Sequence, residues 1–141
     1  MRDVEKTGAD AVVFDASAVL AFLKLERGSR SVKAELMACR AGRKAGWVSP
    51  ATLGEIRRAL RRHLDPGSAR RAVDLLLLTP LAIAPFDRDL AELAADWSHE
   101  TGVDLFDSIV AATTLRLSAA VLTADSDFKR FESRIRVAWI R

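Results

Sequence analysis

Short runs of apolar residues alternate along the chain with longer segments in which apolar residues recur every three or four positions. The first run, at residues 11–14, is typical of a buried strand because all four side chains are apolar. Helical spacing follows the pair Ser49-Pro50, since serine caps a first turn well and proline fits its first position. The pattern predicts strands at residues 11–14, 47–48, 81–86, 120–123 and 137–140, and helices at residues 17–25, 29–44, 50–65, 68–78, 88–101 and 106–117, with a helical turn near 127–131. This alternation predicts an α/β fold, a mostly parallel sheet with helices on both faces.

The composition indicates one globular domain over residues 1–141, in which residues 1–10 form an extension before the first strand. The chain has 141 residues, of which 50% are hydrophobic and 29% are charged, which suffices for one sizeable core. No apolar run approaches the roughly 20 residues that cross a bilayer, and the first ten residues lack the apolar core of a signal peptide. We therefore expect a cytoplasmic protein with no membrane segment.

Four acidic residues occupy positions at which an α/β fold gathers side chains. Asp15 and Asp125 each follow a predicted strand, and Glu55 and Asp107 lie near the starts of predicted helices. In a parallel sheet both kinds of position face the edge formed by the carboxyl ends of the strands. Converging carboxylates repel one another unless a cation lies between them, and Mg²⁺ prefers oxygen ligands. The sequence therefore predicts a metal-dependent phosphoryl-transfer site.

Neighbouring polar residues have secondary roles in this prediction. Asp127 is expected to be an auxiliary ligand because it lies two residues after Asp125, and Asp104 is expected to be structural. Ser17 and Thr123 are candidates to hydrogen-bond the ligands. Each acidic residue also has an ordinary alternative as a helix cap, a turn former or a solvent-facing side chain. The prediction therefore rests on their coincidence.

Cysteine and histidine residues do not indicate a zinc site. Cys39 is the single cysteine, so it has no partner for an internal disulfide, and we expect it to be a packed helix residue. His63 and His99 lie far apart in the sequence, and neither has another ligand at metal-binding spacing.

The net charge of +3 conceals an uneven distribution. Basic residues dominate residues 24–44, 57–71 and 129–141, whereas residues 87–107 hold seven acidic residues and one arginine. This division suits a polyanion that basic rims guide toward an acidic centre. The candidate polyanion-binding residues are Arg57, Arg58, Arg61 and Arg62, although a merely solvated helix face explains them equally well. No aromatic residue is interleaved with them, so base stacking is not indicated.

Four local strings resemble the motifs of one family, the PIN-domain ribonucleases. Residues 12–18 (VVFDASA) resemble its opening Asp-x-Ser-Ala element, and residues 49–55 (SPATLGE) resemble the segment with its helix-borne acid, here Glu55. Residues 107–113 (DSIVAAT) resemble its Asp-x-x-x-Ala-Ala-x element, and residues 122–128 (LTADSDF) its closing Thr-x-Asp-x-Asp-Phe element. The likeness extends over residues 11–140 and is greatest to the VapC toxins of toxin–antitoxin pairs. The extension at residues 1–10 departs from that subgroup.

The resemblance implies a three-layer α/β/α fold with a five-stranded sheet and endonucleolytic hydrolysis of RNA. It also implies one or two Mg²⁺ or Mn²⁺ ions at Asp15, Glu55, Asp107 and Asp125, a small antitoxin partner and a homodimer. The ions would neutralise charge on the scissile phosphate and activate a water.

Two other classes of protein share part of this pattern. A phosphatase of the haloacid-dehalogenase type needs a second aspartate two residues after the first, and that position is Ser17. A non-catalytic RNA-binding or partner-binding domain of the same fold is the remaining alternative. Repulsion within an idle acidic cluster argues against it, and Mg²⁺-dependent RNA cleavage that EDTA abolishes would separate the two.

Overall fold

Five parallel strands form a single sheet at the centre of the structure, a computed structural model that describes residues 10–140. The strands are β1 (Ala11–Phe14), β2 (Ala45–Val48), β3 (Leu81–Ile83), β4 (Ala120–Thr123) and β5 (Arg136–Trp139), in the order β3-β2-β1-β4-β5. The helices are α2 (Ala16–Leu23), α3 (Ser29–Arg40), α4 (Pro50–Leu60), α5 (Pro66–Leu76), α6 (Arg88–Thr101) and α7 (Leu105–Arg116), with a 3₁₀ helix, η2 (Ser126–Phe131). The predicted extension at residues 1–10 lies, apart from Asp10, outside the described residues.

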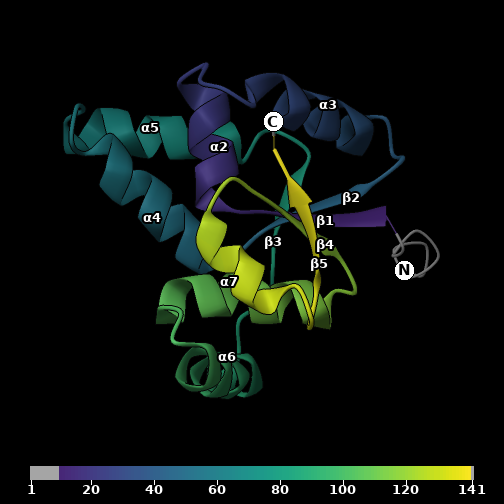
Figure 1. The fold of residues 1–141 in the computed structure, drawn as a ribbon. Coiled ribbons are helices and arrows are strands. Elements are labelled where there is room, and N and C mark those ends of the chain that lie inside the picture. Colours follow the sequence, from purple (N-terminus) through teal and green to yellow (C-terminus); the bar gives the residue numbers. More distant parts are fainter. Residues whose placement is uncertain (1–9, 141) are drawn as a thin grey trace.

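The sheet separates two helical layers (Figure 1). Val12 and Phe14 of β1 point to one face and pack with residues of α2, α3 and α4, whereas Val13 points to the other face and packs with residues of α6, α7 and η2. Alternate side chains of a strand lie on opposite faces, so an entirely apolar strand must be covered on both. The predicted three-layer α/β/α fold is confirmed, and the sheet is entirely parallel.

Three predicted boundaries were too generous. The helix predicted at residues 50–65 ends at Leu60, and the other two differences have identifiable reasons. The helix predicted at residues 29–44 ends at Arg40, because Gly42 adopts a φ of +78° and the chain then turns into β2. Gly46 of β2 lies so close to α3 that a Cβ there would approach Cys39 Sγ to 2.8 Å. Cys39 is buried in this contact, as predicted. The strand predicted at residues 81–86 ends at Ile83, two residues before Pro85, which lacks a backbone N–H for the ladder.

The strand order creates a switch point between β1 and β4. From β1 the chain builds the sheet outward through β2 and β3, whereas β4 and β5 extend it on the opposite side. The connections therefore diverge at the carboxyl ends of β1 and β4, where such sheets open a crevice. Asp15 and Asp125 directly follow these two strands.

Helix α7 is buried over most of its length and forms a fixed wall of this crevice. Every residue from Asp107 to Thr114 is buried, and Ile109 and Ala112 pack against Leu90 and Ala94 of α6. Small side chains allow α7 to fit between the sheet and α6. None of the helices within residues 10–140 is both long and apolar enough to cross a membrane.

Candidate metal centre

Three carboxylates from three different elements converge at the switch point. Asp15 follows β1, Glu55 lies in α4, and Asp107 lies in the first turn of α7; one carboxylate oxygen of each lies within 4.8 Å of those of the other two. The residues Asp15 and Asp107 are only 2% and 5% exposed. Buried carboxylates this close together are costly unless a cation or a proton compensates their charge.

Hydrogen bonds fix the orientation of the Asp15 carboxylate. The hydroxyls of Ser17 and Thr123 each donate to Asp15 Oδ2 over 2.8 Å, and the Ser17 amide donates to the same oxygen over 3.4 Å. The same two hydroxyl oxygens accept from the amides of Ala124 and Asp125, both over 2.9 Å. Ser17 and Thr123 therefore hold Asp15 in place and also connect the ends of β1 and β4.

Burial raises the pKa values of all three converging carboxylates. Burial raises the pKa of Asp107 to about 8 and that of Glu55 to about 7, with repulsion from Asp15, Asp104 and Asp125 as the next causes. Burial also raises the pKa of Asp15, although its hydrogen bonds from Ser17 and Thr123 oppose the shift. A divalent cation would reverse these shifts, because it stabilises the ionised carboxylates.

The donor atoms fit a hard divalent cation. Glu55 Oε1 is buried and has no hydrogen-bond partner among residues 10–140, so it is available as a ligand. The three converging groups are all carboxylates, the ligands that Mg²⁺ and Mn²⁺ prefer. A buried polar atom without a partner is uncommon in folded proteins, and a bound cation would supply a partner for Glu55 Oε1.

The remaining acidic residues lie around this cluster. Asp104, expected from the sequence to be structural, does cap α7 by accepting from the Asp107 amide over 2.8 Å. Its carboxylate also belongs to a second group within 4.8 Å, with Asp107 and Asp127. Asp125 belongs to neither group within the described chain; it caps η2, where the Asp127 amide donates to it over 2.9 Å. The sequence contained a signal that Asp104 lies near Asp107. The two aspartates are three residues apart at a helix start, which brings the capping residue close to the third residue of the helix.

The four candidate arginines of the α4 segment are all exposed but face two directions. Arg58 and Arg62 line, with Glu55, a cavity of about 240 Å³ between α2 and α4. Arg58 is also close enough to Glu55 to oppose the rise in its pKa. Arg57 and Arg61 do not line that cavity. The structure therefore brings one pair of arginines to the edge of the acidic cluster and turns the other pair away from it.

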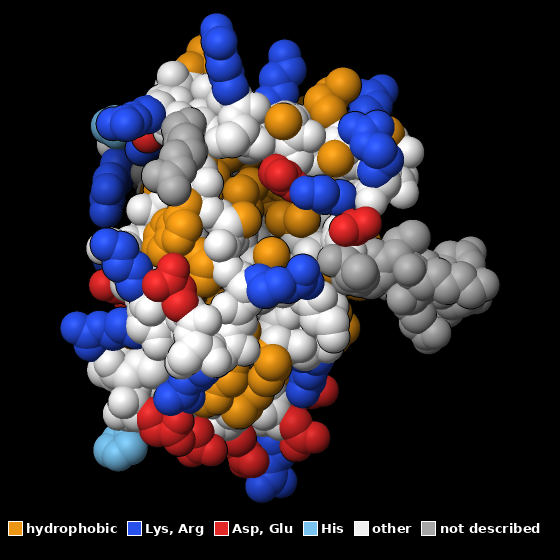
Figure 2. Space-filling model, turned by 45° about the vertical axis from the view of Figure 1, so that its right-hand side comes forward, with side chains coloured by type: hydrophobic (Ala, Val, Ile, Leu, Met, Phe, Trp, Pro, Cys, Tyr) orange, Lys and Arg blue, Asp and Glu red, His pale blue; other side chains and the backbone are white. Residues whose placement is uncertain are grey.

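The acidic segment at residues 87–107 does not form one centre, contrary to the interpretation drawn from its charge alone. Its acidic side chains gather along the lower edge of the molecule in Figure 2, where α6 lies in Figure 1. The five exposed members on and before α6 are Asp87, Asp89, Glu92, Asp96 and Glu100. Only Asp104 and Asp107 of this segment reach the candidate site.

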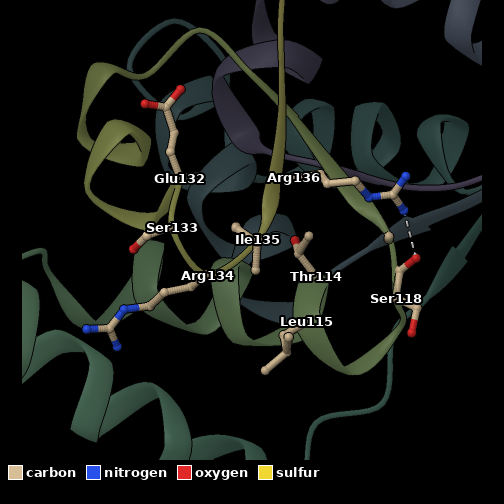
Figure 3. Close-up of a pocket in the computed structure, with 9 residues that line it drawn as sticks. Thr114, Leu115, Ser118, Glu132, Ser133, Arg134, Ile135 and Arg136 are labelled. Carbon is tan, nitrogen blue, oxygen red and sulfur yellow. Dashed lines mark hydrogen bonds between the residues drawn. The ribbon is translucent and has the colours of Figure 1, made fainter.

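A second cavity, of about 410 Å³, lies near the opposite edge of the sheet, where β4 and β5 begin (Figure 3). Its two arginines already have partners. Arg136 donates to the Ser118 carbonyl over 3.0 Å, and Arg134 pairs with Glu100 over 2.7 Å while its guanidinium lies 5.2 Å from the Trp97 ring centre. The cavity is thus bounded by groups that hold the fold together, and the acidic cluster remains the candidate site.

A parallel α/β sheet with a carboxylate cluster at its switch point defines the structural class of the chain. The sequence model of the PIN domain family matches residues 12–133. The chain belongs to the PIN domain family, which confirms the resemblance seen in its four motifs. No curated protein sequence matches it.

Solved structures of toxin–antitoxin complexes share this fold. VapBC-1 from nontypeable Haemophilus influenzae is 14% identical, with a TM-score of 0.69 over 91% of this chain and 96% of that one. VapBC2 from Rickettsia felis is 15% identical, with a TM-score of 0.72 over 93% of this chain and 99% of that one. VapBC-5 from Mycobacterium tuberculosis is 21% identical, with a TM-score of 0.56 over 94% and 98%.

Proposed function

We propose that the protein is a metal-dependent endoribonuclease and the toxin of a VapBC-type toxin–antitoxin pair. The observation that carries the proposal is the convergence of Asp15, Glu55 and Asp107 around one point, with a buried Glu55 oxygen that has no partner among the described residues. Membership of the PIN domain family and the similar folds of VapBC complexes support it.

In this proposal Asp15, Glu55 and Asp107 hold Mg²⁺ or Mn²⁺, and Asp125 and Asp127 complete the ligand set. The ion supplies Lewis-acid chemistry, since it neutralises charge on the phosphate and lowers the pKa of water. Ser17 and Thr123 keep Asp15 oriented through their 2.8 Å hydrogen bonds. Hydrolysis forms a bond between a water oxygen and phosphorus and breaks the bond to the 3′ oxygen, which leaves with a proton.

The arginines have separate roles in binding RNA. Arg58 and Arg62 lie beside the acidic cluster and would bind phosphates of nucleotides next to the cleaved bond. Arg57 and Arg61 lie elsewhere on the exposed surface and contribute general attraction for a polyanion. The carboxylates would otherwise repel the RNA backbone, so flanking cations are needed for binding.

We also propose that a small antitoxin inhibits the protein by inserting an arginine among the carboxylates, because a guanidinium pairs with the same oxygens that hold metal. Homodimerisation through apolar helix faces and a cytoplasmic location complete the proposal.

The test is cleavage of RNA by the purified protein with Mg²⁺ or Mn²⁺ and with EDTA. The proposal expects cleavage that requires the ion and leaves internal cuts in the RNA. If RNA binds but stays intact under all these conditions, the protein is the non-catalytic RNA-binding alternative.

A further inference from the structure

A cavity of about 420 Å³ opens directly beside the acidic cluster, on the side between α4 and α7. Glu55 and Asp104 form its wall toward the cluster, and Arg58 lies on α4 at its margin. The remaining lining is Gly54 together with Leu105 and Phe106, the first two residues of α7. The size lies within the range of small-ligand sites in proteins.

The apolar pair Leu105 and Phe106 is not required by the core. Both residues are 48% exposed, whereas α7 is buried from Asp107 to Thr114. A half-exposed phenylalanine gives up part of the stabilisation that burial would supply. The sequence did not reveal this feature, because no aromatic residue lies near Arg58 along the chain. The fold brings Phe106 and Arg58 to the same cavity from different helices.

The lining combines an aromatic ring, a guanidinium and two carboxylates, and this combination suits a nucleotide better than an apolar protein side chain. A base can stack on the ring of Phe106, and its phosphate can pair with Arg58. The hydrogen-bonding edge of a base also tolerates neighbouring carboxylates, whereas an apolar side chain would desolvate Glu55 and Asp104 without compensation.

We propose that this cavity receives an unpaired RNA base next to the cleaved phosphodiester and that Phe106 is its stacking surface. This inference rests on the proposed function and adds a base-binding contact to it. A base within a helix is stacked and paired, so it cannot enter the cavity without being unstacked. Cleavage should therefore occur in single-stranded segments and loops and should be absent from continuous duplex.

Position 54 offers a way to block the cavity without disturbing the fold. A Cβ built at Gly54 meets no atom within 4 Å, so a larger side chain has room at the cavity margin. Leucine is also a better helix former than glycine, so the variant Gly54→Leu is expected to fold at least as stably as the wild type.

The experiment first maps the cuts that the wild type makes in a pool of short single-stranded RNAs, in the presence of Mn²⁺. A synthetic RNA with one mapped site is then prepared with an abasic nucleotide at each flanking position in turn. Wild type, Phe106→Ala, Phe106→Trp and Gly54→Leu are compared by KM and kcat. Phe86→Ala is the matched control, because Phe86 is 47% exposed but does not line the cavity. Gel filtration of each variant monitors its oligomeric state.

The proposal expects Phe106→Ala to raise KM by roughly 5- to 150-fold, the range found for loss of one stacked base. Phe106→Trp should retain a low KM, Gly54→Leu should raise it, and Phe86→Ala should leave it unchanged. An abasic nucleotide at one position should raise the KM of the wild type by the same factor. It should not raise the KM of Phe106→Ala any further, because both changes remove the same contact.

Several results would overturn the proposal. Equal KM values for the wild type and Phe106→Ala would show that no base stacks on Phe106. The same conclusion would follow if every abasic position raised the KM of both proteins by the same factor. A change of oligomeric state in Phe106→Ala would assign the ring to a protein contact. In either case wild-type cleavage would leave the proposed function standing, whereas a wild type that cuts no RNA would refute both.

Discussion

Asp107 lies in the first turn of a buried helix and faces several other carboxylates. Its pKa is raised to about 8, first by burial and then by repulsion from its neighbours. The fold keeps it there through the packing of α7 and the hydrogen bond from its amide to Asp104. Such an arrangement costs stability in the absence of a cation, which is characteristic of functional rather than structural residues.

Replacement of Asp15 or Asp107 by asparagine should abolish RNA cleavage and leave the fold intact. Each change removes one ligand but preserves size, so above about pH 8, where Asp107 is ionised, the metal-free protein should become more stable as repulsion is relieved. Cleavage assays and thermal unfolding in EDTA measure the two effects. Asp96→Asn on the exposed face of α6 is the matched control and should change neither RNA cleavage nor the unfolding temperature. Full activity in Asp15→Asn or Asp107→Asn would remove that residue from the ligand set.

The raised pKa values also predict how stability depends on pH. Glu55 and Asp107 retain protons up to about pH 7 and about pH 8, whereas the unfolded chain releases them near the ordinary values of 4.5 and 3.8. Between these limits the folded state binds more protons, so the stability of the metal-free protein falls as pH rises. The unfolding temperature in EDTA should fall by about 5 °C or more from pH 5 to pH 8.5.

The same series in Asp107→Asn should show a smaller fall, because one of the two titrating groups is gone. Saturating Mn²⁺ should also reduce the fall in the wild type, since the bound ion stabilises the ionised carboxylates. An unfolding temperature in EDTA that stays constant or rises over this interval would contradict the account of the cluster.

At the scale of the element, the end of α4 and the turn that follows it present two pairs of arginines, Arg57 with Arg61 and Arg58 with Arg62. Removing Arg58 and Arg62 together should weaken RNA binding and reduce the slope of log K against log salt by about 1.4, because each lost phosphate contact on a single strand contributes about 0.7. Binding isotherms in the Asp107→Asn background, over a range of NaCl concentrations, provide the measurement.

The pair Arg57 and Arg61 is the control for this comparison, since its removal takes the same charge from the same segment of the chain. Both residues lie outside the lining of the cavity beside Glu55, so the change in slope should be clearly smaller. Equal slopes for the two double variants would mean that only the net charge of α4 matters.

The elements themselves could be predicted from the sequence, because apolar runs and cap residues are local signals. Strands β1 and β4 match their predicted bounds, and Ser49 caps α4 by accepting from the Ala51 amide. The ends of α3, α4 and β3 were missed. Contacts between elements decide the end of α3, and the loss of an amide donor at Pro85 decides that of β3. Local patterns do not contain that information.

The convergence of acidic residues at one edge was also predictable, because the carboxyl ends of parallel strands meet there. The sequence could not show, however, which of these acidic residues lie closest to one another. Asp104 was expected to be structural, yet it joins Asp107 and Asp127 in a group of carboxylates. The proximity of Phe106 to Arg58 depends on how α7 packs against α4, and no spacing within either helix indicates it.

At the scale of the whole molecule, the proposed antitoxin and the metal ion compete for the same carboxylates. The apparent affinity of a co-purified partner should therefore weaken as Mg²⁺ or Mn²⁺ is raised. Titration of the ion into the complex, followed by a binding measurement, tests this expectation. A partner affinity that is indifferent to the ion would mean that inhibition acts away from the cluster, through dimer geometry or the arginines of α4.

The central claim is that Asp15, Glu55 and Asp107 form a divalent-cation site, and calorimetric titration of the purified protein with Mn²⁺ tests it most directly. The titration is run at pH 7 in two buffers with different ionisation enthalpies, so that released protons are counted. Since Glu55 and Asp107 hold protons near this pH, saturable binding should release about one proton or more in the wild type and should be lost in Asp107→Asn. Absence of binding, or equal binding by Asp107→Asn, would contradict the account.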